Sequence, residues 1–232
     1  MNKTAWIIFS LLTVGILATL IMVSGGTKLD VTKVDLSTIQ TANKQDGQIA
    51  DHVFGKTGSK VTLIEYGDFQ CPACGSIHST VRKITEEYKD QLQFVFRNFP
   101  LAALHANAKA SAAAVEAAGL QGKYWEMHNK IYESQDAWST LSGEERTSFY
   151  TKAATDLGLD VNKFKTDMAS QSVNSKLDYD YALGKKANVE GTPTFYLSGK
   201  KLDQSAYVDE ATFIKTIDAE LKKAGITLPT AN

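Results

Sequence analysis

The chain contains two cysteines, Cys71 and Cys74, which are separated by a proline and an alanine. A short apolar, β-branched run at residues 61–66 precedes the pair, and apolar residues at helical spacing follow it to about residue 88. This placement between a strand and a helix favours a redox-active pair over a static disulfide or two inert thiols. With two cysteines in 232 residues, a four-cysteine zinc site and a disulfide-rich scaffold are excluded.

The order of strand, loop and helix predicts different environments for the two sulfurs. Cys71 is expected at the exposed start of the helix, where unpaired N–H groups and the helix dipole stabilise a thiolate. Pro72 suits the first helical turn, because no hydrogen bond is lost there through its missing N–H. Cys74 is expected one turn later and more buried. Cys71 would then form the mixed disulfide with a substrate, and Cys74 would resolve it.

Two other parts of the sequence are candidates for the same site. Glu65 interrupts the apolar strand; if buried, its carboxyl would have a raised pKa and could take a proton from Cys74, whereas the alternative is an exposed strand end. Pro193 stands at the mouth of a β-prone run at 194–197. The Thr192–Pro193 bond is either cis, exposing the Thr192 backbone to an extended substrate, or part of a simple loop.

A metal site is the weaker interpretation of the cysteine motif. Cys71, Cys74 and His78 would share one helical face, but no fourth ligand is spaced to complete the set. We therefore expect no metal and no cofactor, and we expect His78 to be a surface residue of the helix.

Beyond the cysteines, the chain reads as an α/β domain interrupted by helices. A strand, a helix and a second strand at 92–96 indicate a parallel crossover within residues 51–100. Residues 101–187 carry only helical signals, which indicates an inserted helical subdomain. Strand signals return within residues 188–226, with a hairpin and a closing amphipathic helix at 209–224.

The N-terminus carries a membrane signal. After a short tail at 1–4, residues 5–23 are uncharged and long enough to span a bilayer as a helix. We predict a retained transmembrane anchor at 5–24 rather than a cleaved signal peptide, followed by a linker at 25–50 that acts as a stalk. The net charge of −1 gives no basic field for nucleic acid. The cysteine chemistry favours a catalytic domain outside the cytoplasm, at the cell membrane.

Together these features resemble the DsbA-like family of thioredoxin-fold proteins, in the branch with a helical insertion. The resemblance covers about residues 48–226, and it is carried by LIEYGDFQCPAC at 63–74, RNFPL at 97–101 with His105 and Asn107, GKYWEMH at 122–128 and GTPTF at 191–195.

The resemblance implies a thioredoxin fold, a buried Glu65, a cis Pro193 and a protein disulfide oxidoreductase. It implies that the chain oxidises cysteines of exported proteins and is re-oxidised by a quinone-linked membrane partner of the DsbB type. Strongly oxidising members often have histidine at the position of Ala73, so a reductase or isomerase of the same fold is the alternative. A metal-binding or chaperone-like binding module is a further, weaker one.

Overall fold

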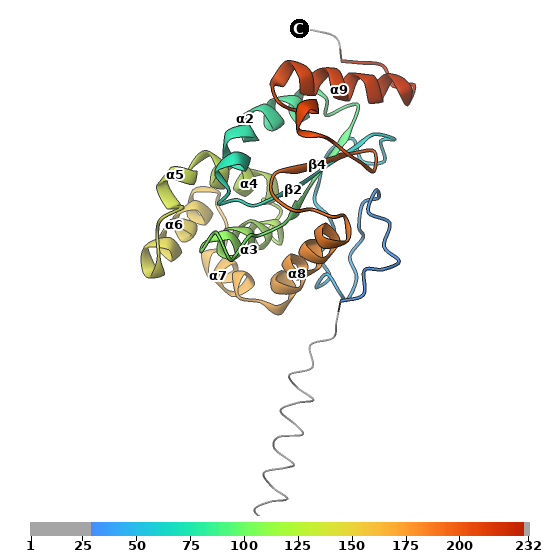
Figure 1. The fold of residues 1–232 in the computed structure, drawn as a ribbon. Helices are drawn as coiled ribbons and strands as arrows, with labels where there is room; N and C mark the ends of the chain where they lie inside the picture. The colour runs from blue at the N-terminus through green and yellow to red at the C-terminus, as the bar shows by residue number, and fades with distance from the viewer. Residues whose placement is uncertain (1–28, 230–232) are drawn as a thin grey trace, which may run out of the picture. The chain divides into compact units, whose positions relative to one another are not determined.

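The computed structural model describes residues 29–229 (Figure 1). The predicted tail at 1–4 and the predicted anchor at 5–24 lie outside these residues. Within the described range, none of the helices has both the length and the apolar character needed to cross a membrane.

A five-stranded mixed sheet forms the centre of the domain. Its spatial order is β1-β3-β2-β4-β5; β2 and β3 are parallel, and the other neighbours are antiparallel. The parallel pair is the crossover expected from the sequence, and both of its strands are buried on both faces, which explains their near-continuous apolar character. The strands are β1 (Val53–Gly55), β2 (Thr62–Gly67), β3 (Gln93–Asn98), β4 (Thr194–Leu197) and β5 (Lys200–Lys201).

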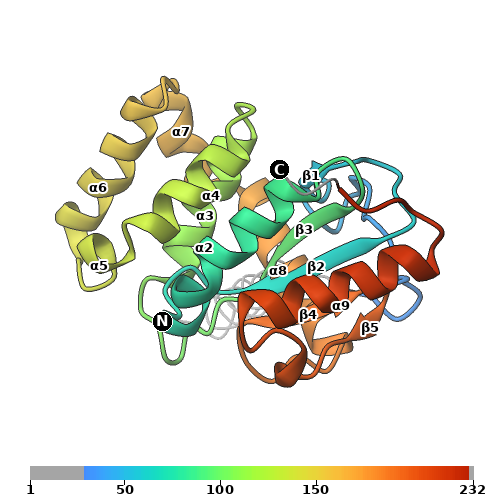
Figure 2. The ribbon, with the colours of Figure 1, turned by 90° about the horizontal axis from the view of Figure 1, so that it is seen from above.

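Two helices pack side by side on one face of this sheet, as Figure 2 shows. They are α2 (Pro72–Glu87), which follows the cysteine loop, and α9 (Glu210–Lys223) near the C-terminus. The Tyr88 hydroxyl, at the end of α2, donates to Asp218 of α9 at 2.8 Å. Because side chains alternate along β2, Glu65 shares its face with Leu63 and points to the same side of the sheet as Cys74.

A helical subdomain is inserted between β3 and β4, within the predicted range 101–187. Trp138, Tyr150 and Phe164 are fully buried in it and belong to the same hydrophobic core as the sheet residues Leu63 and Phe96. The helical signals of the sequence do not show the break at Ser134, which separates two of the helices. The subdomain contains α3 (Ala108–Gly119), α4 (Tyr124–Glu133), α5 (Gln135–Trp138), α6 (Gly143–Asp156), α7 (Val161–Met168) and α8 (Gln171–Lys186).

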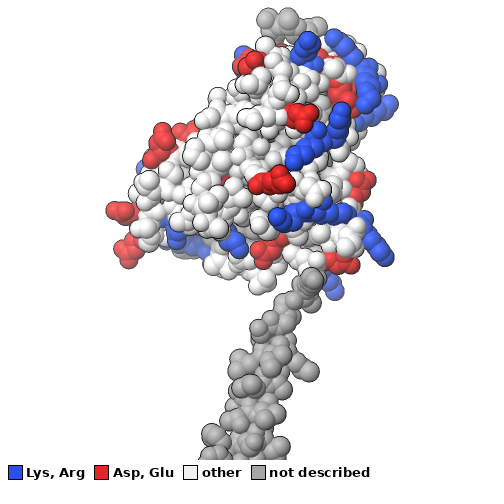
Figure 3. All heavy atoms as spheres, in the orientation of Figure 1, with Lys and Arg blue, Asp and Glu red and all other residues white. Residues whose placement is uncertain are grey.

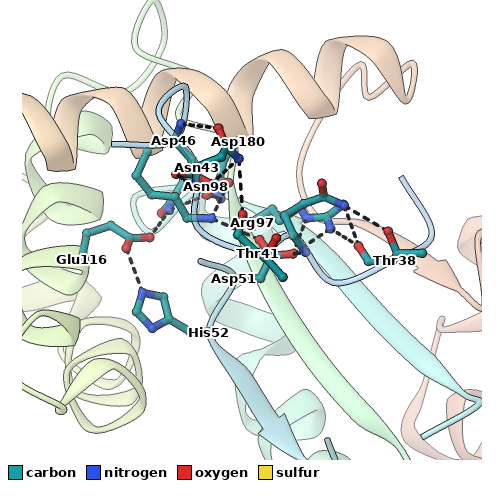
Figure 4. A network of polar contacts seen from close by, with 12 residues as sticks. Thr38, Thr41, Asn43, Asp46, Asp51, His52, Arg97, Asn98, Glu116 and Asp180 are labelled. Atoms are coloured by element: carbon teal, nitrogen blue, oxygen red, sulfur yellow. Dashed lines mark hydrogen bonds and ion pairs between the residues drawn. The ribbon is translucent and has the colours of Figure 1, made fainter. Parts of the chain in front are cut away.

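A buried network of charged side chains lies on the other face of the sheet, between β3 and α8 (Figure 4). Lys176 of α8 contacts Asp180 at 2.8 Å and Asp51 at 3.1 Å, while Arg97 of β3 contacts Asp51 at 2.8 Å. These side chains are at most 2% exposed. Buried charges are tolerated only when paired and hydrogen-bonded, so this network fixes how the insertion joins the sheet.

The prediction that residues 25–50 form a linker is wrong from Val31 onward; residues 25–28 lie outside the described range. From Val31 onward the chain belongs to the same compact unit as the rest of the domain. The Lys186 ammonium binds the carbonyl oxygens of Val31, Thr32 and Val34, and Arg97 binds that of Thr38 at 2.8 Å. These contacts use the main chain, which explains why the segment has no apolar period in its sequence. We call residues 31–49 the N-terminal strap.

Acidic and basic side chains are interspersed over the face of the domain that Figure 3 shows. Most of the surface ion pairs join neighbours on one helix or on adjacent helices, such as Lys163 with Asp167 on α7. Such exposed pairs contribute little to stability.

Candidate active site

The two cysteines occupy the first turn of α2, directly after β2 and a short loop. The Asp68 carbonyl accepts the Cys71 N–H at 3.0 Å, and its carboxylate accepts the Gln70 N–H at 2.8 Å. Cys71 is the N-cap residue of α2 and Pro72 its first helical residue, as the sequence predicted. The helix therefore begins with its unpaired N–H groups beside the Cys71 sulfur.

Cys71 is in an environment that favours its thiolate. Its pKa is lowered to about 5, above all by a hydrogen bond from the Cys74 thiol, then by the Thr192 side chain and the N–H groups of Cys74 and Ala73; burial acts in the opposite direction. In the dithiol form its Sγ donates to the Thr192 carbonyl at 3.3 Å. The prediction of an exposed Cys71 was wrong, because Thr192 covers it and leaves the residue 7% exposed.

Cys74 and Glu65 form the buried side of the pair. Cys74 is fully buried, and burial, the hydrogen bond to Cys71 and the nearby Glu65 raise its pKa well above the usual value. Glu65 is 3% exposed, and burial followed by the charge of Cys71 raises its pKa to about 8. The prediction of a buried Glu65 is confirmed. A carboxyl that titrates near neutral pH can exchange a proton with the Cys74 sulfur.

The strand β4 supplies the wall opposite the cysteines. The Thr192–Pro193 peptide bond is cis, which confirms that prediction, and it ends just where β4 starts. A groove of about 760 Å³ runs past Thr192, Pro193 and Ala73 and is also lined by Ile77 and Tyr207. The predicted site residues Glu65, Cys71, Pro72, Ala73, Cys74, Thr192 and Pro193 therefore come together at one place, the junction of β2, α2 and β4.

The prediction of His78 on the helix surface was wrong. His78 is 7% exposed and stacks on Tyr132 of α4 with ring centroids 4.8 Å apart. Burial, followed by the charge of Arg82, lowers its pKa to about 4, so it is neutral at physiological pH. Its place four residues after Cys74, on the apolar stripe of α2, was the signal for burial. Among residues 29–229, no three His, Cys, Asp or Glu side chains are grouped to hold a metal ion.

Sequence reasoning also missed side chains that hold the cysteine loop from outside. Asp68 accepts the Leu101 N–H at 2.9 Å and pairs with His105 at 2.7 Å. Gln135 of α5 donates to the carbonyl of Cys71 at 3.0 Å. These residues lie 33 to 64 positions from their partners in the sequence, so no local pattern indicates that they contact one another.

Comparison with solved structures identifies the fold. BdbD from Bacillus subtilis, in its oxidised form, superimposes with a TM-score of 0.64 at 24% identity, over 80% of this chain and 98% of that one. Wolbachia pipientis α-DsbA1 superimposes with a TM-score of 0.60 at 22% identity, over 75% of this chain and 92% of that one. Both likenesses support the predicted fold class.

Curated relatives are similar over part of their length. The Na⁺/H⁺ antiporter NhaA 1 of Salinispora arenicola is 35% identical over 151 residues, which are 65% of this chain and 22% of the antiporter. The corresponding protein of Mycolicibacterium gilvum is 33% identical over 173 residues, 73% of this chain and 26% of its own. The chain thus spans about a quarter of the length of these relatives.

A protein-family sequence model described as thioredoxin matches residues 48–219 of this chain, from the end of the N-terminal strap into α9. This range holds the whole cysteine site, including Glu65 and the cis proline. The chain therefore belongs to the thioredoxin family, with the fold of the DsbA-like thiol–disulfide oxidoreductases.

Proposed function

We propose that the chain oxidises cysteines of exported proteins by dithiol–disulfide exchange at Cys71 and Cys74. The observation that carries the proposal is the placement of the two sulfurs within one turn of α2. Cys71 is the N-cap residue with its Sγ 3.3 Å from the Thr192 carbonyl, whereas Cys74 is fully buried, so Cys71 favours the thiolate and Cys74 the thiol. With this asymmetry, Cys71 is suited to be the leaving thiolate of a mixed disulfide, and Cys74 is suited to stay buried and protonated.

The reaction starts from the oxidised Cys71–Cys74 pair. A client thiolate attacks Cys71 Sγ, which forms a mixed disulfide and releases the Cys74 sulfur, and Glu65 supplies the proton that this buried sulfur requires. A second client thiolate then attacks the client sulfur of the mixed disulfide and releases Cys71 as a thiolate. Two client thiols are oxidised and the Cys71–Cys74 pair is reduced by two electrons. Thiolates of low pKa leave fastest, which suits Cys71 to this last step.

The same asymmetry supports oxidation as the direction of electron flow. Lowering the pKa of Cys71 from 9.0 to about 5 stabilises the dithiol form at pH 7. With allowance for partial solvent screening, this amounts to about 1.5–2.7 kcal/mol, or about 30–60 mV towards a more oxidising potential. The start of α2 and Thr192 thus stabilise the Cys71 thiolate, which is part of what a histidine at position 73 would do.

The reduction potential against glutathione tests the direction. We expect a value at least about 30–60 mV less negative than about −270 mV, in the direction of about −120 mV; a value of about −270 mV would instead identify a disulfide reductase. Cys71→Ser should abolish oxidation of a reduced model protein. Cys74→Ser, first converted at Cys71 to the mixed disulfide with glutathione, should exchange glutathione for the model protein and accumulate that mixed disulfide. Oxidation that survives loss of Cys71 would reject the mechanism and favour a binding module.

We also propose where the chain works in the cell and which kind of membrane protein re-oxidises it. An uncharged run at 5–23 supports a membrane anchor, with the domain outside the cytoplasm and within reach of a quinone-linked partner of the DsbB type. Fractionation of cells that express the full chain, with labelling of Cys71 by a membrane-impermeant thiol reagent, tests this. We expect the chain in the membrane fraction and labelling in intact cells; labelling only after lysis would reject the location.

A further inference from the structure

One side chain of the helical insertion reaches the turn that carries the cysteines. Gln135, the first residue of α5, donates through Nε2 to the carbonyl oxygens of Phe69 at 2.7 Å and Cys71 at 3.0 Å. These two carbonyls flank the last residue of the loop before α2. A single amide therefore holds both sides of the loop–helix junction, from a part of the chain 64 residues away from Cys71.

The first turn of α2 is shaped to receive this amide. Gly75 donates its N–H to the same Cys71 carbonyl at 3.1 Å and closes the first helical hydrogen bond. A Cβ at Gly75 would lie 2.4 Å from Oε1 of Gln135 and 3.0 Å from its Nε2. The amide therefore lies against bare backbone, and a side chain at position 75 would displace it.

The segment that carries Gln135 is itself fixed. Trp138 at the end of α5 is fully buried, and its indole N–H donates to the Ile131 carbonyl at 2.8 Å. Gln70 of the cysteine loop donates to the Ser139 carbonyl at 2.6 Å, which makes a second tie between loop and insertion. Gln135 is thus a rigid support for the loop rather than a surface side chain that happens to contact it.

We propose that Gln135 is a positioning residue for Cys71, through which the helical insertion sets how strongly the site favours the thiolate. This inference rests on the proposed function and names the residue that tunes its redox site. The N–H groups of Ala73 and Cys74 stabilise the Cys71 sulfur. The Cys71 carbonyl that Gln135 holds belongs to the peptide just before these two N–H groups, so Gln135 fixes the orientation of the helical turn that presents them. Hydrogen bonds to a charged group lose strength steeply with misalignment.

Two substitutions of Gln135 test the role directly. Gln135→Glu keeps the shape, loses both donors and brings carboxylate oxygens against two carbonyls beside the thiolate. We expect the ultraviolet absorbance of the Cys71 thiolate to titrate about 1–2 pH units higher, and the equilibrium with glutathione to shift about 10-fold or more towards the disulfide. Gln135→Met fills the same space without charge or donors, and we expect a shift in the same direction of about 3-fold.

A third substitution displaces the amide without changing it. Alanine has a higher helix propensity than glycine, so Gly75→Ala is not expected to act merely by lowering the stability of the helix. Gly75→Ala should nevertheless raise the pH at which the Cys71 thiolate titrates, as Gln135→Met does. In a variant that combines Gly75→Ala with Gln135→Met, the two shifts in the Cys71 titration should not add, because both substitutions remove the same contact.

The matched control is Gln121→Glu. Gln121 lies after α3 in the same insertion and also donates its Nε2 to a carbonyl, that of Asp160 at 3.1 Å. For the Gln121→Glu variant we expect the Cys71 thiolate titration and the glutathione equilibrium to equal those of the unaltered chain. If Gln135→Glu, Gln135→Met and Gly75→Ala lower the unfolding temperature but leave both readouts unchanged, Gln135 is only structural. Both readouts concern the cysteine pair alone, so this result would leave client oxidation, and hence the proposed function, to its own test.

Discussion

Replacing Glu65 by glutamine should change how stability depends on pH. The pKa of this carboxyl is raised from 4.5 to about 8 by burial and by the charge of Cys71. Between these two values the folded protein holds a proton that the unfolded chain releases, so the carboxyl makes the protein less stable as pH rises. Glutamine has nearly the same shape and does not titrate, so Glu65→Gln removes this loss.

The size of the effect follows from the same two pKa values. Between about pH 5 and pH 7.5, integration of the proton difference gives a loss of about 3 kcal/mol in the unfolding free energy of the unaltered chain. Other groups titrate in this interval as well, and Cys71 is one of them, but they are common to both proteins. The difference between the two proteins should therefore grow by about 3 kcal/mol in favour of the Glu65→Gln variant over this interval.

Urea unfolding of both reduced proteins at several pH values measures this difference by linear extrapolation. Glu145→Gln, at an exposed position of α6, serves as the control and should give no such trend. In the disulfide form the Cys71 charge is absent, so the gap should narrow. A difference that stays within about 1 kcal/mol across the pH range would refute a buried, neutral Glu65 and with it the proton exchange with Cys74.

Three further predictions concern the cysteine pair, the buried network and the N-terminal strap. Iodoacetamide should alkylate Cys71 with a midpoint near pH 5, whereas Cys74 should stay unmodified up to about pH 9; mass spectrometry of the peptides distinguishes the two sites, and equal rates would contradict the asymmetry. Lys176→Met leaves the buried Asp180 without its cation and Asp51 with Arg97 alone, and should cost about 3–5 kcal/mol in urea unfolding. Lys163→Met breaks an exposed pair and should cost less than about 1 kcal/mol. Lys186→Met should speed hydrogen exchange at 31–34 in the N-terminal strap but not in α9; unchanged exchange would mean that other contacts hold the strap.

Local sequence was sufficient for the parts of the site that lie on one element. The apolar run before Cys71, the proline after it and the stripe that follows predicted β2, α2 and the place of both cysteines, because strand and helix periods are local properties. Glu65 and Pro193 were identified as candidates, yet periodicity left their burial and peptide geometry open. The resemblance favoured the outcome that the structure shows for each.

The N-terminal strap and the support of the cysteine loop were not predictable in this way. The strap is held by Lys186 and Arg97 through main-chain carbonyls, and such contacts leave no trace in the identity of the residues held. His78 is a different case: its polar type suggested the surface, but its position on the apolar stripe of α2 indicated the burial against α4 that the structure shows.

The sequence by itself determined that Cys71 and Cys74 form one site at the start of a helix, since the spacing and the flanking periods are written within about 30 residues. Only the tertiary structure decided how the two sulfurs differ. Thr192 lies 121 residues from Cys71 and Gln135 lies 64, and both reach the first turn of α2 only when the chain is folded. The physical reason is that pKa values depend on burial, nearby charge and hydrogen bonds across space, which no local pattern specifies.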